Sequence, residues 1–198
     1  KDRVVLGKRM EDHLRFAVCF WHTFCWPGSD VFGAGTFSRP WHAGPNDAVR
    51  ARAKREAGLA FVEKLDVPFY CFHDVDVMAD ADGVTDFRKS FAEAVDHLEE
   101  LQAKHGRKLL WGTANLFSHP RYMNGAATNP DFAVLAKAGE QVKNALDATI
   151  ALDGSGNVYV ADADFGVRKV APNGTVTTLA MTPNVSENYL SDVAVDAS

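Results

Sequence analysis

Apolar and polar residues alternate with two different periods along this chain, and the change of period divides it into two parts. In the first part, short apolar runs alternate with longer segments whose apolar residues recur every three or four positions. This pattern predicts strands at residues 15–21, 67–72 and 108–111 and helices at residues 47–65, 85–106 and 131–146. Elements in the order βαβαβα predict a parallel sheet with helical crossovers.

The second part of the chain begins near Asp147 and shows no helical period. Short strands are predicted at residues 158–160, 168–170 and 175–179, with turn-forming residues between them. The strand-like quartet Ile150-Ala-Leu-Asp153 recurs 43 residues later as Val193-Ala-Val-Asp196, and that step is typical of one blade of a β-propeller. The alternative is a coincidence between two short apolar quartets, but the intervening strands also fit one blade.

Composition excludes several classes of function. The chain has 198 residues, of which 46% are hydrophobic and 24% are charged, as in soluble globular proteins. A net charge of −5 and scattered basic residues leave no basic stripe for nucleic acid. No apolar run approaches the roughly 18 residues of a membrane span. Cys19, Cys25 and Cys71 lack the spacing of metal ligands or of a disulfide framework. We therefore expect a cytoplasmic protein with reduced thiols, and no nucleic-acid or membrane partner.

Both ends of the sequence look truncated. The first residue is Lys1 rather than Met, and the last residues interrupt a strand-like pattern. We therefore expect the sequence to be cut at both ends.

A histidine and two aspartates stand directly behind the second predicted strand, in the stretch "CFHDVDV" at residues 71–77. Taken alone, such a stretch is more typical of a polar strand end that closes a turn than of a catalytic site. The segments around it are "FAVCFWHTFCW" at 16–26, "LLWGTANLFSHPRY" at 109–122 and "GAATNP" at 125–130. Together with residues 67–77, and in this order, they resemble xylose isomerase of the longer, class II type, over residues 10–148.

Residues from about 150 onward are instead similar to an NHL-type β-propeller repeat. The similarity is carried by "LDGSGNVYVAD" at 152–162 and "RKVAPNGTV" at 168–176. The two resemblances together imply an α/β fold class with two domains. Residues 1–148 would form a partial TIM (β/α)8 barrel of about three βα units, and residues 149–198 a short all-β segment like one propeller blade.

The isomerase resemblance implies a function for the residues behind the second strand. In a TIM barrel the catalytic groups lie where strands end at the carboxyl face. His73 and Asp76 match the catalytic pair of the family, in which the aspartate orients the imidazole and the histidine moves a proton as the sugar ring opens. Asp74 matches no catalytic residue, and we expect it to accept a hydrogen bond or to cap a loop.

Other residues match the walls of the family's sugar pocket. Trp21, Trp111 and Phe117 match apolar residues that exclude water, which suits a hydride shift. Thr113 matches a polar pocket residue, and Phe32 matches a phenylalanine that reaches the site of a neighbouring subunit. The alternative for each aromatic residue is an ordinary place in the core.

The implied reaction is the metal-dependent isomerisation of D-xylose to D-xylulose, with xylose or glucose as the sugar and a homotetramer as the assembly. The family holds two divalent cations, Mg²⁺, Mn²⁺ or Co²⁺, on ligands from later strands that this sequence lacks. We therefore expect no metal ligands in this chain and no activity of the chain alone. The alternative is a non-catalytic chimera that acts as a propeller-type binding module, for which no metal-dependent sugar binding is expected.

Overall fold

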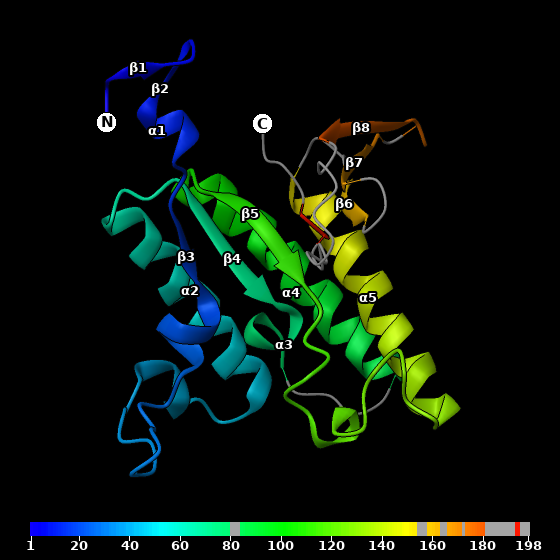
Figure 1. Ribbon diagram of the computed structural model, residues 1–198. Coiled ribbons are helices and arrows are strands. Elements are labelled where there is room, and N and C mark those ends of the chain that lie inside the picture. The colour runs from blue at the N-terminus through cyan, green and yellow to red at the C-terminus, as the bar shows by residue number, and fades with distance from the viewer. Residues whose placement is uncertain (80–83, 154–157, 163–165, 172, 181–192, 195–198) are drawn as a thin grey trace.

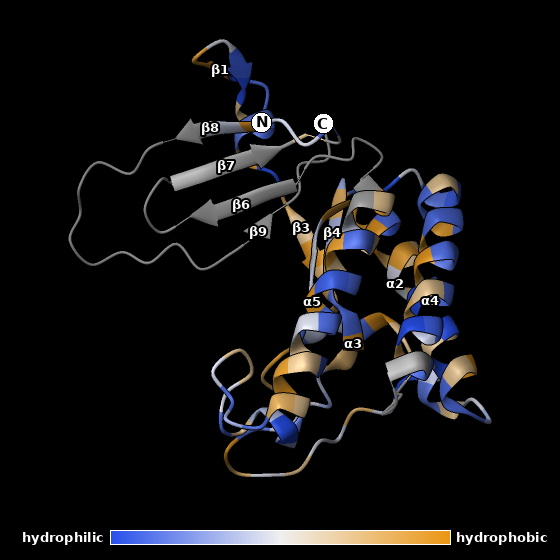
Figure 2. Cartoon of the chain, turned by 90° about the vertical axis from the view of Figure 1, so that its right-hand side faces the viewer, coloured by the Kyte–Doolittle hydropathy of each residue, from blue (hydrophilic) through white to orange (hydrophobic). Residues whose placement is uncertain are grey.

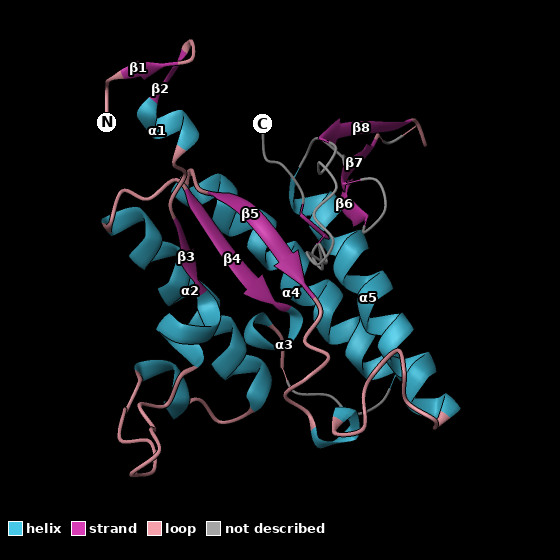
Figure 3. Cartoon of the chain, viewed as in Figure 1, coloured by secondary structure: helices cyan, strands magenta, loops and turns pink. Residues whose placement is uncertain are grey.

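The computed structural model describes residues 1–79, 84–153, 158–162, 166–171, 173–180 and 193–194. Within these residues the strands form three sheets (Figures 1 and 3). The first sheet is a small antiparallel hairpin of β1 (Val4–Val5) and β2 (Lys8–Arg9), followed by the short helix α1 (Met10–His13). Figure 1 shows this N-terminal segment projecting from the main sheet, and α1 buries none of its residues.

The second sheet is parallel and has the strand order β3-β4-β5. Its strands are β3 (Ala17–Cys19), β4 (Phe69–His73) and β5 (Lys108–Thr113). The parallel sheet predicted from the βαβαβα pattern is confirmed. Because parallel strands end at the same edge, the residues that follow β3, β4 and β5 lie close together.

Three long helices lie on one face of this sheet (Figure 1). They are α2 (Asp47–Lys64), α4 (Val84–His105) and α5 (Phe132–Asp153). Helix α2 begins where predicted, because the Asn46 side chain accepts a hydrogen bond of 3.0 Å from the Val49 main-chain N–H. In Figure 2, β3 and β4 are largely apolar, whereas α4 and α5 carry many polar residues on their outward surfaces. None of the helices in the described part of the chain combines the length and apolar character of a membrane span.

Two short 3₁₀ turns lie in the connections between these elements. The turn η2 (Pro40–Ala43) precedes α2, and the turn η3 (Pro120–Tyr122) lies between β5 and α5. Each begins at a proline, whose fixed φ suits the first position of a helical turn. The long loops predicted before the first and third helices therefore contain local helical structure.

One core lies between the sheet and the helices. Its buried residues are Phe20, Phe24, Leu59, Val62, Tyr70, Phe72, Val77, Met78, Phe87, Phe91, Ala94, Val95, Leu98, Leu101, Leu109, Ala148 and Leu152. Tyr70 and Phe72, which alternate with Cys71 along β4, both belong to this core. Strand β4 therefore anchors the helical layer, and His73 is its last residue.

The first predicted strand is wrong at its end, because β3 stops at Cys19 and residues Trp21–Cys25 form a π-helical turn (η1). This turn allows both Phe20 and Phe24 to be buried in the core, with ring centroids 5.0 Å apart. Residues four apart lie on one face of a helical turn and can pack together there. Burial of the two rings explains why an apolar run of strand length ends in a helical turn.

The third predicted helix is also wrong at its end, because α5 continues past residue 146 to Asp153. Leu152 belongs to the main core, and the Thr149 hydroxyl donates to Ala145 O at 2.6 Å and lies 3.2 Å from Gly112 O of β5. These contacts extend the helix. The quartet 150–153 is consequently helical. The prediction that it forms a strand, as residues 193–196 were predicted to do, is wrong.

The third sheet is antiparallel and has the strand order β8-β7-β6-β9. Its strands are β6 (Val158–Asp162), β7 (Gly166–Val170), β8 (Val176–Ala180) and β9 (Val193–Ala194). The three strands predicted after residue 150 are confirmed. Residues 195 and 196 of the predicted repeat lie outside the described residues, and one four-stranded sheet does not by itself show a propeller.

Between α2 and α4 the chain buries a histidine and an arginine that contact each other. Arg55 Nε donates to His97 Nδ1 at 3.0 Å, and the Arg55 guanidinium also donates to Val77 O. Burial lowers the pKa of His97, and the positive charges of Arg55 and Arg52 lower it further. The bond from Arg55 requires an unprotonated Nδ1, so the folded chain favours the neutral imidazole.

We expect the unfolding free energy of the chain to fall as the pH drops from about 7.5 to 5. Replacing His97 by glutamine should make this fall smaller. A histidine with a lowered folded-state pKa contributes stability above its unfolded pKa of about 6.5, and this contribution is lost as the pH falls through the folded value. Urea unfolding across this pH range measures it, with the exposed His13→Gln as control. Parallel pH profiles for the wild type and His97→Gln would contradict the prediction.

Candidate functional site

The first feature of the site is a histidine–aspartate pair at the carboxyl end of β4. His73 ends β4 and precedes the short helix α3 (Asp74–Val77). Asp76 Oδ2 accepts a hydrogen bond of 2.8 Å from the His73 main-chain N–H and lies 3.2 Å from His73 Nδ1. A carboxylate can only accept, so Nδ1 carries the proton and Nε2 is the ring nitrogen that can exchange one. The turn that starts α3 therefore also orients the imidazole.

Aromatic side chains from three segments surround this imidazole. The centroid of the His73 ring lies 4.7 Å from Trp21, 5.5 Å from Phe117 and 6.1 Å from Trp111. Trp21 and Trp111 also contact each other, with centroids 5.2 Å apart. Only 14% of the His73 side chain and 7% of the Asp76 side chain are exposed. The structure thus brings five of the seven predicted site residues together at one edge of the sheet.

Of the other two predicted site residues, Thr113 also lies beside His73, whereas Phe32 does not. Thr113 lies beside His73, because the two residues are partners in the register between β4 and β5. Phe32 lies on the turn after η1, is 93% exposed and has its main-chain N–H bonded to Asp30 Oδ1 at 2.8 Å. Within this chain Phe32 is therefore displayed to solvent rather than placed beside His73.

Asp74 is fully buried and connects three segments of the chain. Its Oδ1 accepts from the Val75 and Asn115 main-chain N–H groups at 2.8 and 2.9 Å, and its Oδ2 accepts from Gln141 Nε2 at 2.9 Å. The Tyr122 hydroxyl donates to the same Gln141 side chain. Burial raises the pKa of Asp74, and its hydrogen bonds oppose that rise. The prediction that Asp74 accepts hydrogen bonds is confirmed.

Sequence reasoning missed the partners of Asp74. Gln141 lies 67 residues away in the chain, on a helix face that reads as ordinary polar surface. Asn115 lies in a loop, where asparagine is common because its side chain can bond to nearby main-chain groups. In this loop the Asn115 side chain does accept from Ser118 N and Oγ, at 2.9 and 2.8 Å. No pattern in the sequence connects these residues, so only the fold could reveal the network.

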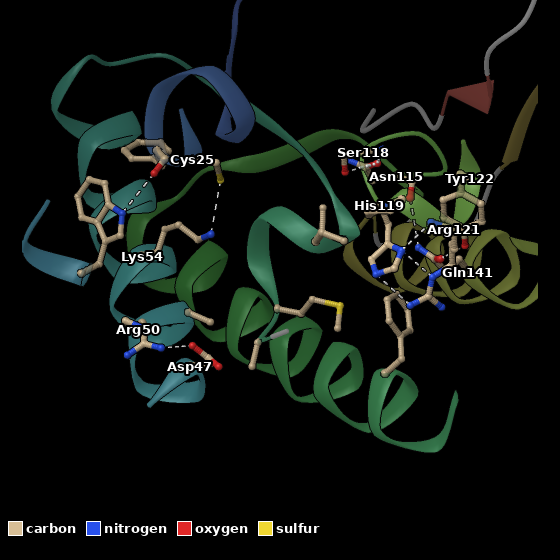
Figure 4. A pocket seen from close by; sticks show the side chains of 18 of the residues that line it. Cys25, Asp47, Arg50, Lys54, Asn115, Ser118, His119, Arg121, Tyr122 and Gln141 are labelled. Carbon is tan, nitrogen blue, oxygen red and sulfur yellow. Dashed lines mark hydrogen bonds and ion pairs between the residues drawn. The ribbon is translucent and has the colours of Figure 1, made fainter. Parts of the chain in front are cut away.

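A separate cavity of about 500 Å³ lies near this site but does not contain the pair (Figure 4). Its lining comes from η1, η2, α2, the segment 75–79, α4, the segment 115–122 and α5, and none of Trp21, His73 and Trp111 belongs to it. Within the described residues, the predicted sugar site is thus an aromatic surface at the sheet edge and not this cavity.

The described residues do not form a set of metal ligands. No three histidine, cysteine, aspartate or glutamate side chains in the described ranges lie close enough to hold a metal ion. The His73–Asp76 pair offers one imidazole and one carboxylate, fewer than a protein site for a divalent cation uses. The residues present therefore do not fit the two-cation site that the resemblance implies.

These features define a parallel α/β protein with an imidazole–carboxylate pair at the carboxyl edge of its sheet. About 80% of the chain is homologous to curated xylose isomerases. Over 158 residues it is 78% identical to the xylose isomerase of Novosphingobium aromaticivorans and 55% identical to that of Solibacter usitatus. Over 157 residues, 79% of the chain, it is 53% identical to the xylose isomerase of Photobacterium profundum.

The chain spans about 36% of the length of each of these relatives. The resemblance to xylose isomerase is therefore confirmed for most of this chain and for about a third of that enzyme. No protein-family model matches the chain. Nothing in the comparisons shows an NHL repeat.

Proposed function

We propose that this chain carries the ring-opening part of an aldose isomerase site, with His73 and Asp76 as the proton-transfer pair. The observation that supports it best is the 3.2 Å contact between His73 Nδ1 and Asp76 Oδ2 under aromatic side chains at the end of β4. Its position in a segment of 158 residues that is 78% identical to a xylose isomerase indicates an aldose, with xylose first and glucose second, as the ligand.

The pair has the chemistry that ring opening requires. A cyclic aldose opens when the anomeric hydroxyl loses its proton, the C1=O1 bond forms, the C1–O5 bond breaks and O5 gains a proton. His73 Nε2 can accept the first proton and return it to O5, while Asp76 holds Nδ1–H and stabilises the imidazolium that forms between the two transfers. The sugar is neutral before and after, so the step needs no further reactant.

The surrounding residues suit a sugar. Trp21, Trp111 and Phe117 offer ring faces and edges to the apolar C–H surface of a sugar and keep water away from the imidazole. Thr113 brings a hydroxyl beside His73. We propose that Phe32, exposed in a single chain, completes the site of a neighbouring subunit in a homo-oligomer such as the tetramer implied by the resemblance.

The hydride shift that converts an aldose to a ketose is a separate step. In the family, divalent cations such as Mg²⁺, Mn²⁺ or Co²⁺ supply the polarisation of the sugar oxygens. The described residues form no ligand set for them. We therefore propose that the chain opens the sugar ring but that xylulose formation needs ligand residues from another polypeptide.

A second candidate function rests on the antiparallel sheet. Strand β9, which begins the repeated quartet, pairs with β6. Propeller blades are four-stranded antiparallel sheets, and this sheet has four strands, although the first copy of the quartet lies in α5. This arrangement supports an NHL-like segment over residues 149–198 that acts as a propeller-type binding module. The domain boundary proposed at residues 148/149 then falls inside α5, so the junction between the two folds lies within or after this helix.

The cysteines support a cytoplasmic location. All three, Cys19, Cys25 and Cys71, are free thiols, and Cys71 is buried. Free thiols persist in a reducing compartment.

The experiment that tests the ring-opening proposal is the mutarotation of α-D-xylose, which reports ring opening without isomerisation. We expect the chain to accelerate it above the buffer rate, and His73→Asn to lower that acceleration about 100-fold, as expected for loss of a general acid–base group. The matched control is His22→Asn, because His22 is exposed and adjacent to Trp21. Equal rates for the wild type and His73→Asn would contradict the proposal. Xylulose formation with added Mg²⁺ or Co²⁺ would contradict the statement that further ligand residues are needed.

A further inference from the structure

The cavity of about 500 Å³ is separate from the His73 cluster, and several basic residues belong to its described lining. Four of its lining residues are basic, namely Arg50, Lys54, Arg121 and Lys137, and Asp47 is the acidic residue among the lining residues described. Figure 4 shows Arg50 and Lys54 on one side of the cavity and Arg121 on the opposite side. A cavity of this size is ordinary for a small-molecule site.

On the side of the cavity formed by α2, Lys54 forms no ion pair with a carboxylate of the described residues. Asp47 pairs with Arg50 within the first turns of α2 and is therefore already neutralised. Lys54 Nζ lies 3.5 Å from Cys25 Sγ, which is its hydrogen-bond partner among the described residues. Burial raises the pKa of Cys25 to about 11, so this thiol is neutral near pH 7. The described residues thus leave the charge of Lys54 uncompensated where it faces the cavity.

A second cation of the lining, Lys137, comes from α5 and has no hydrogen-bond acceptor among the described residues. Lys137 is 7% exposed, and its Nζ is buried without a hydrogen bond among the described residues. Its nearest carboxylate oxygen, Glu140 Oε2, is 3.7 Å away, too long for a hydrogen bond, and Glu140 also pairs with Arg88 at 3.2 Å. The nearby Phe87 ring, 4.5 Å from Nζ, contributes only a weak attraction. A buried ammonium group without a close acceptor is costly unless a ligand supplies one.

We propose that this cavity binds a small molecule with two phosphate groups, one held by Lys54 of α2 and the other by Lys137 of α5. Phosphate oxygens accept charge-assisted hydrogen bonds from ammonium and guanidinium groups, and Arg50 and Arg121 belong to the same lining. A ligand with two separated anionic groups matches cations from two different helices, α2 and α5, better than a single phosphate does. Val75 of α3 also lines the cavity, so the ligand contacts the helix that carries Asp76.

The test is isothermal titration calorimetry of the full chain at constant ionic strength with fructose 1,6-bisphosphate, fructose 6-phosphate, inorganic phosphate and fructose. We expect the bisphosphate to bind most tightly and fructose not to bind. Lys54→Met and Lys137→Met should each weaken bisphosphate binding about tenfold, through loss of a charge-assisted hydrogen bond. The matched control is Lys64→Met, on the exposed surface at the end of α2. Equal affinity for the bisphosphate and inorganic phosphate, or equal weakening by Lys64→Met, would overturn the proposal.

A second measurement needs no variant, in case Lys137→Met does not fold. Alkylation of Cys25 by iodoacetamide should be slowed by the bisphosphate, because Cys25 lines the cavity. Cys19, which is also a partly exposed free thiol but does not line the cavity, provides the internal reference. An unchanged ratio of the two labelling rates at saturating bisphosphate would contradict binding in this cavity.

Discussion

Replacing Asp74 by alanine is expected to lower the unfolding free energy of the chain by about 3–5 kcal/mol. Asp74 is fully buried and accepts hydrogen bonds from the main-chain N–H groups of Val75 and Asn115 and from the Gln141 amide. Alanine leaves these donors buried without acceptors, and hydrogen bonds to a charged group contribute about 1.5–3 kcal/mol each. Alanine also removes the cost of burying the carboxylate, so we expect less than the sum of three bonds.

The comparison with Asp74→Asn tests the reason for this loss. Asparagine keeps one oxygen, which can still accept from the two main-chain groups, but it places an amide N–H₂ toward the Gln141 donor. We expect a loss of about 1–2 kcal/mol, clearly smaller than for alanine. Urea unfolding followed by the fluorescence of the four tryptophans measures both variants. Equal stability of Asp74→Ala and the wild type would show that the network contributes nothing to the fold.

Replacing Gly58 by alanine is expected to destabilise the chain by about 1–3 kcal/mol, although alanine is the better helix former by about 1 kcal/mol. Gly58 lies in the middle of α2, against the ring of Phe20. A Cβ atom at this position would lie 2.4 Å from Phe20 Cζ, and Phe20 is fully buried between Phe24 and Tyr70. The ring has no room to move, so the overlap outweighs the gain in helix propensity.

A double-mutant cycle tests this explanation. Phe20→Leu removes the ring and destabilises the chain by itself, but in that background Gly58→Ala should be neutral or stabilising. The expected coupling between the two positions is at least about 1 kcal/mol, measured by urea unfolding of the wild type and three variants. The control is Ala60→Gly, a half-buried position on the same helix, which reports the difference in helix propensity without the contact to Phe20. Additive effects of the Phe20 and Gly58 substitutions would contradict direct contact as the cause.

The order of elements could be predicted because periodicity is a local property of the sequence. Asn46 indicates the start of α2 through its cap, and the apolar run before His73 indicates β4. The ends of elements were less predictable. Phe20 and Phe24 turn the chain into η1, and Thr149 and Leu152 extend α5 to Asp153, because both ends depend on contacts with residues far away in sequence.

The site shows the same division. His73 and Asp76 lie three residues apart in one local turn, which brings their side chains together. The register between β4 and β5 places Thr113 beside His73. The contacts of His73 with Trp21 and Phe117 require three separate segments to meet, and sequence suggested them only through a family resemblance.

The sequence by itself determined the βαβαβα order, the antiparallel strands after residue 157 and the resemblance of most of the chain to xylose isomerase, because periodicity and motifs are local. Only the tertiary structure decided that Gln141 donates a hydrogen bond to the buried Asp74 carboxylate. It also decided that Lys54 and Lys137 line a common cavity. The physical reason is that burial and charge compensation depend on which distant residues come within a few ångströms, and no local pattern specifies that.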